Sequence, residues 1–269
     1  MLQADWKPNG VVALLTDFGL KDPYVGLMKA VLLARAPHLR IVDLTHGVPA
    51  QDVRVGAFFL ERSRNYFAPG TVHVGVVDPG VGSERRLIVA LDSGQCFLGP
   101  DNGLLAGCLG SRAEVFELDH ARCALPAPAR TFHGRDLLAP AAAAIAAGTD
   151  PRSLGLRAID DCVRLAAPVV ERSMDGTRVT VEVLFCDRYG NAVLGLGPGD
   201  LEPPLAAWCA RIGARRVGFA ETYAQVRSGE ALLLVDSFAA LEIAVRDGDA
   251  SAELGLARGM RVILEQTAP

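Results

Sequence analysis

Short apolar runs alternate with helical segments along the first third of the chain. Three runs are rich in β-branched residues and end at turn-forming residues, which favours strands; they are Val11–Leu15, Ile41–Leu44 and residues 72–77. Between them, residues 23–36 and 53–66 carry apolar side chains at helical spacing. Because strands and helices alternate at this spacing in βαβ units, the pattern predicts an α/β domain with a mainly parallel central sheet.

The middle of the chain has a less regular pattern. A strand beginning at Leu87 and a second at Gln95–Leu98 are expected to continue the sheet. Residues 121–130 are expected to form a loop, and Leu137–Ala147 predicts an alanine-rich helix ended by glycine. Residues 162–170 are expected to be an extended strand that leads into a linker.

The pattern changes near residues 173–177, where the segment SMDGT interrupts it. Beyond this point, alternation with a period of two replaces helical periodicity. Short strands are expected at Arg178–Leu184, Asp187–Leu194, Arg215–Phe219, Ala231–Val235, Leu241–Val245 and Met260–Leu264. The sequence therefore predicts two domains, an α/β domain over residues 1–173 and a smaller, mostly β domain over residues 174–269.

Composition narrows the class of protein. The 269 residues are 50% hydrophobic and 22% charged, which is typical of a globular, soluble protein. A net charge of −4 gives no indication of a nucleic-acid or membrane partner. The chain shows neither a secretory signal nor a run of about 18 apolar residues, so a cytoplasmic protein is expected. The six scattered cysteines and five histidines lack metal-binding spacing, so reduced thiols and no metal site are expected.

Two aspartates follow predicted strands directly. Asp17 lies in the segment TDFG after the first strand, and Asp78 begins the segment DPGVG after the third. The carboxyl ends of strands are where α/β sheets bind ligands, and a carboxylate there can bind the vicinal diol of a ribose. The chain has neither GxGxxG nor GxxxxGK[ST], so a phosphate-binding loop is not expected. For either aspartate alone, a helix cap or a turn is an equally ordinary interpretation.

Further candidates lie at the ends of other predicted elements. Arg85 follows the glycine-rich turn, and His133 precedes the start of a predicted helix. Asp187 can pair with an amino group, while the amide of Asn191 can bind the edge of a heterocycle. Ser237 opens a strand, where a hydroxyl can hold a carboxylate. Each feature taken singly is explained as well by a surface ion pair or by turn chemistry.

Taken together, the motifs resemble one family along nearly the whole chain, from about Leu14 to Leu256. The matching segments are TDFGLKDPYVGLMKAV, DLTHGVPAQDVRVGAF, VVDPGVGSERR, FLGPDNG, FHGRD, DRYGN and SFAALEIAV. They resemble the S-adenosylmethionine (SAM) hydroxide adenosyltransferases, adenosine-forming hydrolases related to fluorinase and chlorinase. The resemblance implies SAM as substrate, no cofactor, and a homotrimer whose active sites lie between the N-terminal domain of one subunit and the C-terminal domain of its neighbour.

The resemblance also implies roles for individual residues. Those expected to be catalytic are Asp78, Arg85 and His133. Those expected to bind substrate are Asp17 at the ribose, and Asp187, Ser237 and Asn191 at the methionine and adenine moieties. The halogenase relatives lack the aspartate at this strand end, so Asp78 argues for water rather than halide as the nucleophile. A chlorinase-like halogenase and a non-catalytic adenosine- or SAM-binding protein are the alternative interpretations.

The expected chemistry is in-line attack of water on the ribose 5′ carbon. The leaving group, methionine, departs as a neutral thioether and needs no acid or metal. Arg85 can hold the water and favour hydroxide, His133 can accept the proton as a general base, and Asp78 can orient the set. Which of the three takes the proton stays open at the level of sequence.

Overall fold

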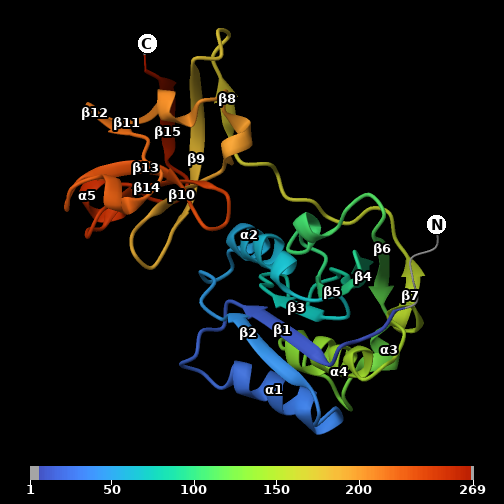
Figure 1. Cartoon of the computed structure of the whole chain (residues 1–269). Coiled ribbons are helices and arrows are strands. Elements are labelled where there is room, and N and C mark those ends of the chain that lie inside the picture. Colours follow the sequence, from blue (N-terminus) through green and yellow to red (C-terminus); the bar gives the residue numbers. More distant parts are fainter. Residues whose placement is uncertain (1–5, 268–269) are drawn as a thin grey trace. The chain divides into compact units, whose positions relative to one another are not determined.

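The computed structural model describes residues 6–267 (Figure 1). The chain divides after Leu165 into two compact units. Residues 173 and 174, where the sequence analysis places the boundary, lie between β8 (Val170–Arg172) and β9 (Arg178–Cys186) in the second unit. Each unit has its own sheet and its own hydrophobic core.

A seven-stranded sheet forms the centre of the first unit, in the order β2-β1-β3-β5-β4-β6-β7. Its strands are β1 (Val11–Thr16), β2 (Arg40–Thr45), β3 (Val72–Val76), β4 (Leu87–Asp92), β5 (Gln95–Pro100), β6 (Glu114–Leu118) and β7 (Gly155–Ala158). The pairs β2–β1, β1–β3 and β3–β5 are parallel, and the remaining three pairs are antiparallel. The α/β class is confirmed, but the sheet is mixed rather than mainly parallel.

The antiparallel half of the sheet originates at a two-residue turn. Ser93 and Gly94 join β4 to β5, and both have positive φ, of 51° and 76°. Positive φ at both central residues is the geometry of a tight hairpin turn. A parallel connection needs a dozen or more residues to cross over the sheet, so two residues force the strands to run in opposite directions.

Helices cover both faces of this sheet, with α1 and α4 on one face and α2 on the other (Figure 1). Their bounds are α1 (Tyr24–Arg35), α2 (Val53–Ser63), α3 (His120–Cys123) and α4 (Ala139–Ala146). Pro23 precedes α1, and Asp52 caps α2 by accepting a hydrogen bond from the backbone N–H of Val55 at 3.2 Å. Met28 and Leu32 of α1 are fully buried in the core on their face.

Several elements differ from the expected ones. Residues 162–169 form no strand, because proline and irregular backbone interrupt the run before β8. The short helix α3 occupies part of the loop expected at residues 121–130. Strands β6 and β7 were not expected; β7 is mostly exposed and therefore lacks an apolar pattern. The β-branched and aromatic residues Val115 and Phe116 of β6 were a usable signal.

An eight-stranded antiparallel sheet forms the second unit, in the order β12-β11-β15-β9-β10-β14-β13, with β8 paired to β9. Its other strands are β10 (Ala192–Leu194), β11 (Trp208–Ile212), β12 (Arg215–Gly218), β13 (Ala231–Val235), β14 (Leu241–Val245) and β15 (Arg261–Gln266), and α5 (Ala250–Leu254) follows β14. An isolated bridge between Phe219 and Leu233 connects the two ends, so the sheet forms a nearly closed barrel. The mostly β character expected here is confirmed.

Short 3₁₀ turns connect the longer elements of both units. They are η1 (Arg64–Tyr66), η2 (Ala106–Cys108), η4 (Pro151–Leu154), η5 (Pro198–Asp200), η6 (Leu205–Ala207) and η7 (Tyr223–Gln225). Within residues 6–267, no helix is long and apolar enough to cross a membrane. In the same residues, no group of three or more histidine, cysteine, aspartate or glutamate side chains is arranged to hold a metal ion.

A fully buried histidine lies on β3, in the middle of the sheet. The His73 ring stacks on Phe97, with centroids 4.9 Å apart, and meets the edge of Phe67 at the same distance. Burial, with a smaller contribution from the charge of Arg64, lowers the pKa of His73 from 6.5 to about 4. The core therefore holds this imidazole in its neutral form.

We predict that this histidine makes the fold sensitive to acid. The unfolded chain binds a proton at His73 from about pH 6.5 downward, and the folded chain only near pH 4. The free energy of unfolding should therefore fall through this window, by roughly 2–3 kcal/mol at pH 4.5. The free energy of unfolding can be measured by urea unfolding at pH 7 and at pH 4.5. His73→Phe should lack the part of the fall between these two pH values that comes from His73. An equal fall in the free energy of unfolding between pH 7 and pH 4.5 in the two proteins would contradict the prediction.

Candidate active site

Asp17 and Asp78 lie at the carboxyl ends of neighbouring parallel strands. Strands β1 and β3 pair in register, with Thr16 opposite Val76. Asp17 follows Thr16 directly, and Asp78 comes two residues after Val76. The two carboxylates therefore lie at one edge of the sheet, where open α/β sheets bind ligands.

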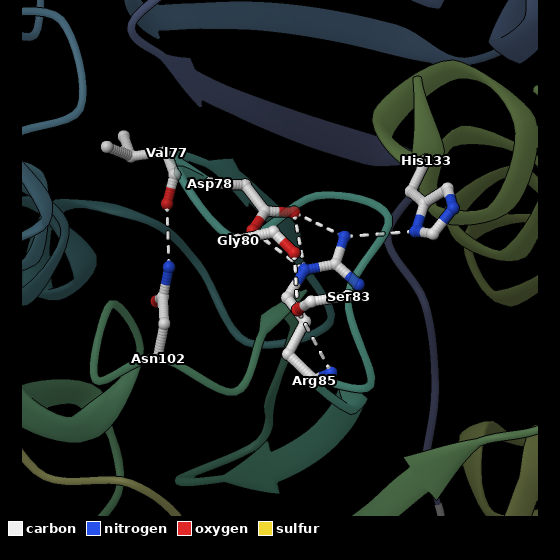
Figure 2. Close-up of polar contacts among 7 residues, drawn as sticks. All are labelled: Val77, Asp78, Gly80, Ser83, Arg85, Asn102 and His133. Atoms are coloured by element: carbon white, nitrogen blue, oxygen red, sulfur yellow. Dashed lines mark hydrogen bonds and ion pairs between the residues drawn. The ribbon is translucent and has the colours of Figure 1, made fainter. Parts of the chain in front are cut away.

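Asp78, Arg85 and His133 form one hydrogen-bonded set (Figure 2). Arg85 donates from Nε to both carboxylate oxygens of Asp78, at 2.7 and 2.8 Å, and from Nη2 to Oδ2. The same Nη2 contacts Nδ1 of His133 at 3.0 Å. The side chains of Asp78 and Arg85 are only 6% and 9% exposed, so this ion pair is shielded from solvent.

The glycine-rich turn gives Arg85 its position. Ser83 donates from Oγ to the carbonyl oxygen of Gly80 at 2.7 Å and accepts from the backbone N–H of Arg85 at 3.3 Å (Figure 2). Gly82 has a φ of +82°, and a Cβ there would lie 2.9 Å from the carbonyl oxygen of Arg130. Glycine is therefore required at this position for both its conformation and its close approach.

Asn102 holds the strand end from which Asp78 projects. Its Nδ2 donates to the carbonyl oxygen of Val77 at 2.9 Å, and its Oδ1 accepts from the backbone N–H of Leu104 at 3.1 Å. This role of Asn102 was not predicted from the sequence. Asn102 lies in the segment GPDNG, where turn chemistry explains the residues, and nothing in that segment points to a distant strand.

An aromatic cluster connects the loop of Asp17 to the loop of His133. Phe18 follows Asp17 and lies 5.7 Å from both Tyr24 and Phe132, measured between ring centroids. Tyr24 and Phe132 lie 5.4 Å apart and meet edge to face. Because Phe132 directly precedes His133, packing within the cluster limits how far the two loops can move apart.

A π-helical turn, η3 (Gly134–Leu138), follows His133 and leads into α4. The predicted helix at 137–147 is therefore present, but its α-helical part begins only at Ala139. A Cβ at Gly134 would lie 3.2 Å from Cγ1 of Val76, so the turn packs directly on the end of β3. Such single turns are frequent at functional sites, and here the turn places His133 beside Arg85.

The surroundings of His133 favour its neutral form. Burial lowers its pKa, and the charges of Arg85 and His120 lower it further. The carboxylates of Asp78 and Asp136 act in the opposite direction without cancelling these effects. The ring of His120 lies 6.1 Å from that of His133.

Residues that follow the neighbouring strand β2 hold the loop of Asp17. Asp17 accepts from the backbone N–H of Gln51 at 2.8 Å. Nδ1 of His46 lies 2.9 Å from Oγ1 of Thr16. The carbonyl oxygen of His46 accepts a hydrogen bond from the backbone N–H of Gly19 at 2.7 Å. His46 was not predicted as a site residue, although its place just after a predicted strand, like that of Asp17, was a usable signal.

The substrate-binding candidates of the second unit lie in two turns. Asp187 accepts from the backbone N–H groups of Tyr189 and Asn191, both at 2.8 Å, and from the side-chain amide of Asn191 at 3.2 Å. The structure thus brings Asp187 and Asn191 into contact. Ser237 lies in the turn between β13 and β14, where its neighbour Asp236 accepts two backbone hydrogen bonds at 2.8 Å.

A buried carboxyl group between these turns was not predicted. Glu242 on β14 is 3% exposed and accepts from the hydroxyl of Tyr223 at 2.7 Å. Burial, with smaller contributions from the charges of Asp187 and Asp236, raises the pKa of Glu242 to about 7. A lone charged residue within the apolar run 241–245 was the available signal.

Comparison with known proteins supports a single family. The model of the SAM hydroxide adenosyltransferase N-terminal domain matches residues 12–155, and that of the C-terminal domain matches residues 181–263. The chain is 42% identical to the (R)-S-adenosyl-L-methionine hydrolase of Thermus thermophilus, over 94% of this chain and 98% of the relative. It is 39% identical to the Salinispora tropica protein of that name, over 95% of this chain and 97% of the relative. A fluorinase from Actinoplanes sp. is 24% identical, over 72% and 74%.

Solved structures agree with these matches. An uncharacterized conserved protein from Thermotoga maritima superposes with a TM-score of 0.85 at 34% identity, over 95% of this chain and all of that one. A conserved hypothetical protein from Thermus thermophilus has a TM-score of 0.74 at 38% identity, over 97% of this chain and 99% of that one. The resemblance found in the sequence is confirmed, and the chain belongs to the SAM hydroxide adenosyltransferase family.

Proposed function

We propose that the protein hydrolyses S-adenosyl-L-methionine to adenosine and L-methionine by in-line attack of water or hydroxide on the ribose 5′ carbon. One observation carries the proposal. The shielded guanidinium of Arg85 is held by Asp78 and His133, and its Nη1 is buried without a hydrogen-bond partner within residues 6–267. A buried N–H donor without a partner is costly, and an oxygen nucleophile would satisfy it.

The chemistry matches these groups. The oxygen of water forms a bond to C5′, and the C5′–S bond breaks with its electron pair going to sulfur. Sulfur thereby loses its positive charge and leaves as a neutral thioether that needs no proton. The remaining tasks are to hold a weak nucleophile in line and to remove its proton. A fixed cationic donor beside the substrate's ribose site contributes to the first task by positioning.

Substrate recognition is divided between the two units in this proposal. Asp17 accepts hydrogen bonds from the ribose hydroxyls, as acidic residues do at the corresponding edge of dinucleotide-binding sheets. Asp187 and Ser237 bind the methionine moiety, and Asn191 binds the adenine edge. In this proposal the protein is a homotrimer, and each SAM site lies between two subunits. One chain contributes its first unit to the site, and the neighbouring chain contributes its second unit.

Incubation with SAM, in the presence and absence of chloride, tests the function. We expect adenosine and methionine in equal amounts under both conditions. Arg85→Ala should lose most of the turnover while SAM still binds, because the assigned contact is to the nucleophile and appears in kcat rather than KM. Formation of 5′-chloro-5′-deoxyadenosine would indicate a halogenase. SAM binding without any product would indicate a non-catalytic binding protein.

The ribose assignment predicts the effect of Asp17→Asn. The variant keeps the shape of the side chain but removes its charge, and charge-assisted hydrogen bonds are stronger than neutral ones. Adenosine should bind more weakly by about 1–3 kcal/mol in calorimetry, with an unchanged melting temperature. Unchanged adenosine affinity would exclude the assigned role.

The assembly predicts a trimeric mass. Light scattering of the purified protein should give three subunits of 28.4 kDa each. Dilution that dissociates the trimer should abolish SAM turnover, because each proposed site combines the first unit of one chain with the second unit of its neighbour. A monomer that turns over SAM at the full rate would contradict this arrangement.

A further inference from the structure

His133 faces a group that can only donate. A guanidinium carries five N–H donors and no acceptor, and it stays protonated in proteins. Nη2 of Arg85 lies 3.0 Å from Nδ1 of His133. Nδ1 must therefore be the acceptor, which requires an unprotonated nitrogen. In the neutral ring the single proton then resides on Nε2.

This tautomer leaves no lone pair for a proton from water. Nδ1 uses its lone pair to accept from Arg85, and Nε2 already carries a proton. A general base on His133 would first have to break the contact with Arg85. Among Asp78, Arg85 and His133, the other hydrogen-bond acceptor is the carboxylate of Asp78. Its two oxygens have about four acceptor positions and use three of them for Arg85.

We propose that His133 is a positioning residue that fixes Arg85 by accepting its hydrogen bond, and that the proton of the attacking water passes to Asp78. The inference rests on the proposed hydrolysis and assigns roles within it. The water oxygen bonds to C5′, the C5′–S electron pair goes to sulfur, and one water proton moves to a carboxylate oxygen of Asp78. Asp78 then releases that proton to solvent.

The geometry of the guanidinium explains why a second acceptor matters. Nη2 donates both to Asp78 and to His133, so the plane of the guanidinium is held from two sides. Nη1 is thereby given one orientation, buried and without a partner within the described residues. His133 itself is fixed between Phe132, in the aromatic cluster, and Gly134, which packs on the end of β3.

Protonation of His133 would undo this arrangement. Both ring nitrogens of an imidazolium are donors, so the contact with Arg85 would be lost and two cations would face each other. The charged and titratable groups around the ring are Arg85, His120, Asp78 and Asp136. The pKa of His133 lies below its ordinary value, chiefly through burial. The kcat should therefore fall at acid pH, and only below the ordinary titration range of histidine, because the pKa is lowered.

Two amide variants separate positioning from general-base catalysis. His133→Asn places an amide oxygen at the position of Nδ1, whereas His133→Gln places it near Nε2. Neither amide accepts a proton near neutral pH. If His133 only accepts from Arg85, the Asn variant should keep kcat within about tenfold of wild type and lose the decline in kcat at acid pH. The Gln and Ala variants should lose a further ten- to hundredfold, roughly the value of one charged hydrogen bond.

A kcat for His133→Asn as low as that of His133→Ala, with SAM binding intact, would overturn the inference and make His133 the base. Nitrogen NMR of the wild-type protein gives a second test that needs no variant. It should show Nδ1 of His133 unprotonated and Nε2 protonated at neutral pH, and the opposite tautomer would also overturn the inference. A wild-type protein that forms no adenosine from SAM would instead refute the proposed function itself.

Discussion

The ion pair between Asp78 and Arg85 is the interaction on which the site depends. Both side chains are almost fully removed from water, and a buried charge is costly unless it is paired and fully hydrogen-bonded. Removing one partner of such a pair typically costs about 3–5 kcal/mol, because the other charge stays buried. The surrounding contacts keep the two charges paired. Asn102 fixes the strand end that carries Asp78, and Ser83 fixes the turn that carries Arg85.

The sheet supplies the rigid frame for this pair. Because β1 and β3 are parallel neighbours in register, their ends present Asp17 and Asp78 at one edge without help from the loops. The aromatic cluster then adds a connection that the sheet does not provide, from the loop of Asp17 to His133. A ribose bound at Asp17 and a nucleophile bound at Arg85 would thus have a separation set by packed elements rather than by mobile side chains.

The sequence predicted the strands and the two aspartates because both depend on local pattern. β-Branched runs identify β1 and β3, and an aspartate directly after such a run lies at the sheet edge whatever the rest of the fold does. The contact between Arg85 and His133 spans 48 positions and depends on topology, so only the family resemblance suggested it. The mixed sheet was missed because one two-residue turn reverses strand direction. The role of Asn102 depends on a distant strand end that no local pattern reveals. His46 and Glu242 each had a local signal, but the pattern did not identify the side chains that they contact.

Charge balance explains why a neutral histidine suits this reaction. The substrate carries a positive sulfonium, and that charge disappears as the C–S bond breaks. A set made of anionic Asp78, cationic Arg85 and neutral His133 has no net charge, so it does not repel the cationic substrate. A protonated His133 would add a cation beside Arg85, oppose substrate binding, and remove the acceptor that orients the guanidinium. Burial of His133 and the neighbouring cation Arg85 lower its pKa and therefore favour the same protonation state that the chemistry requires.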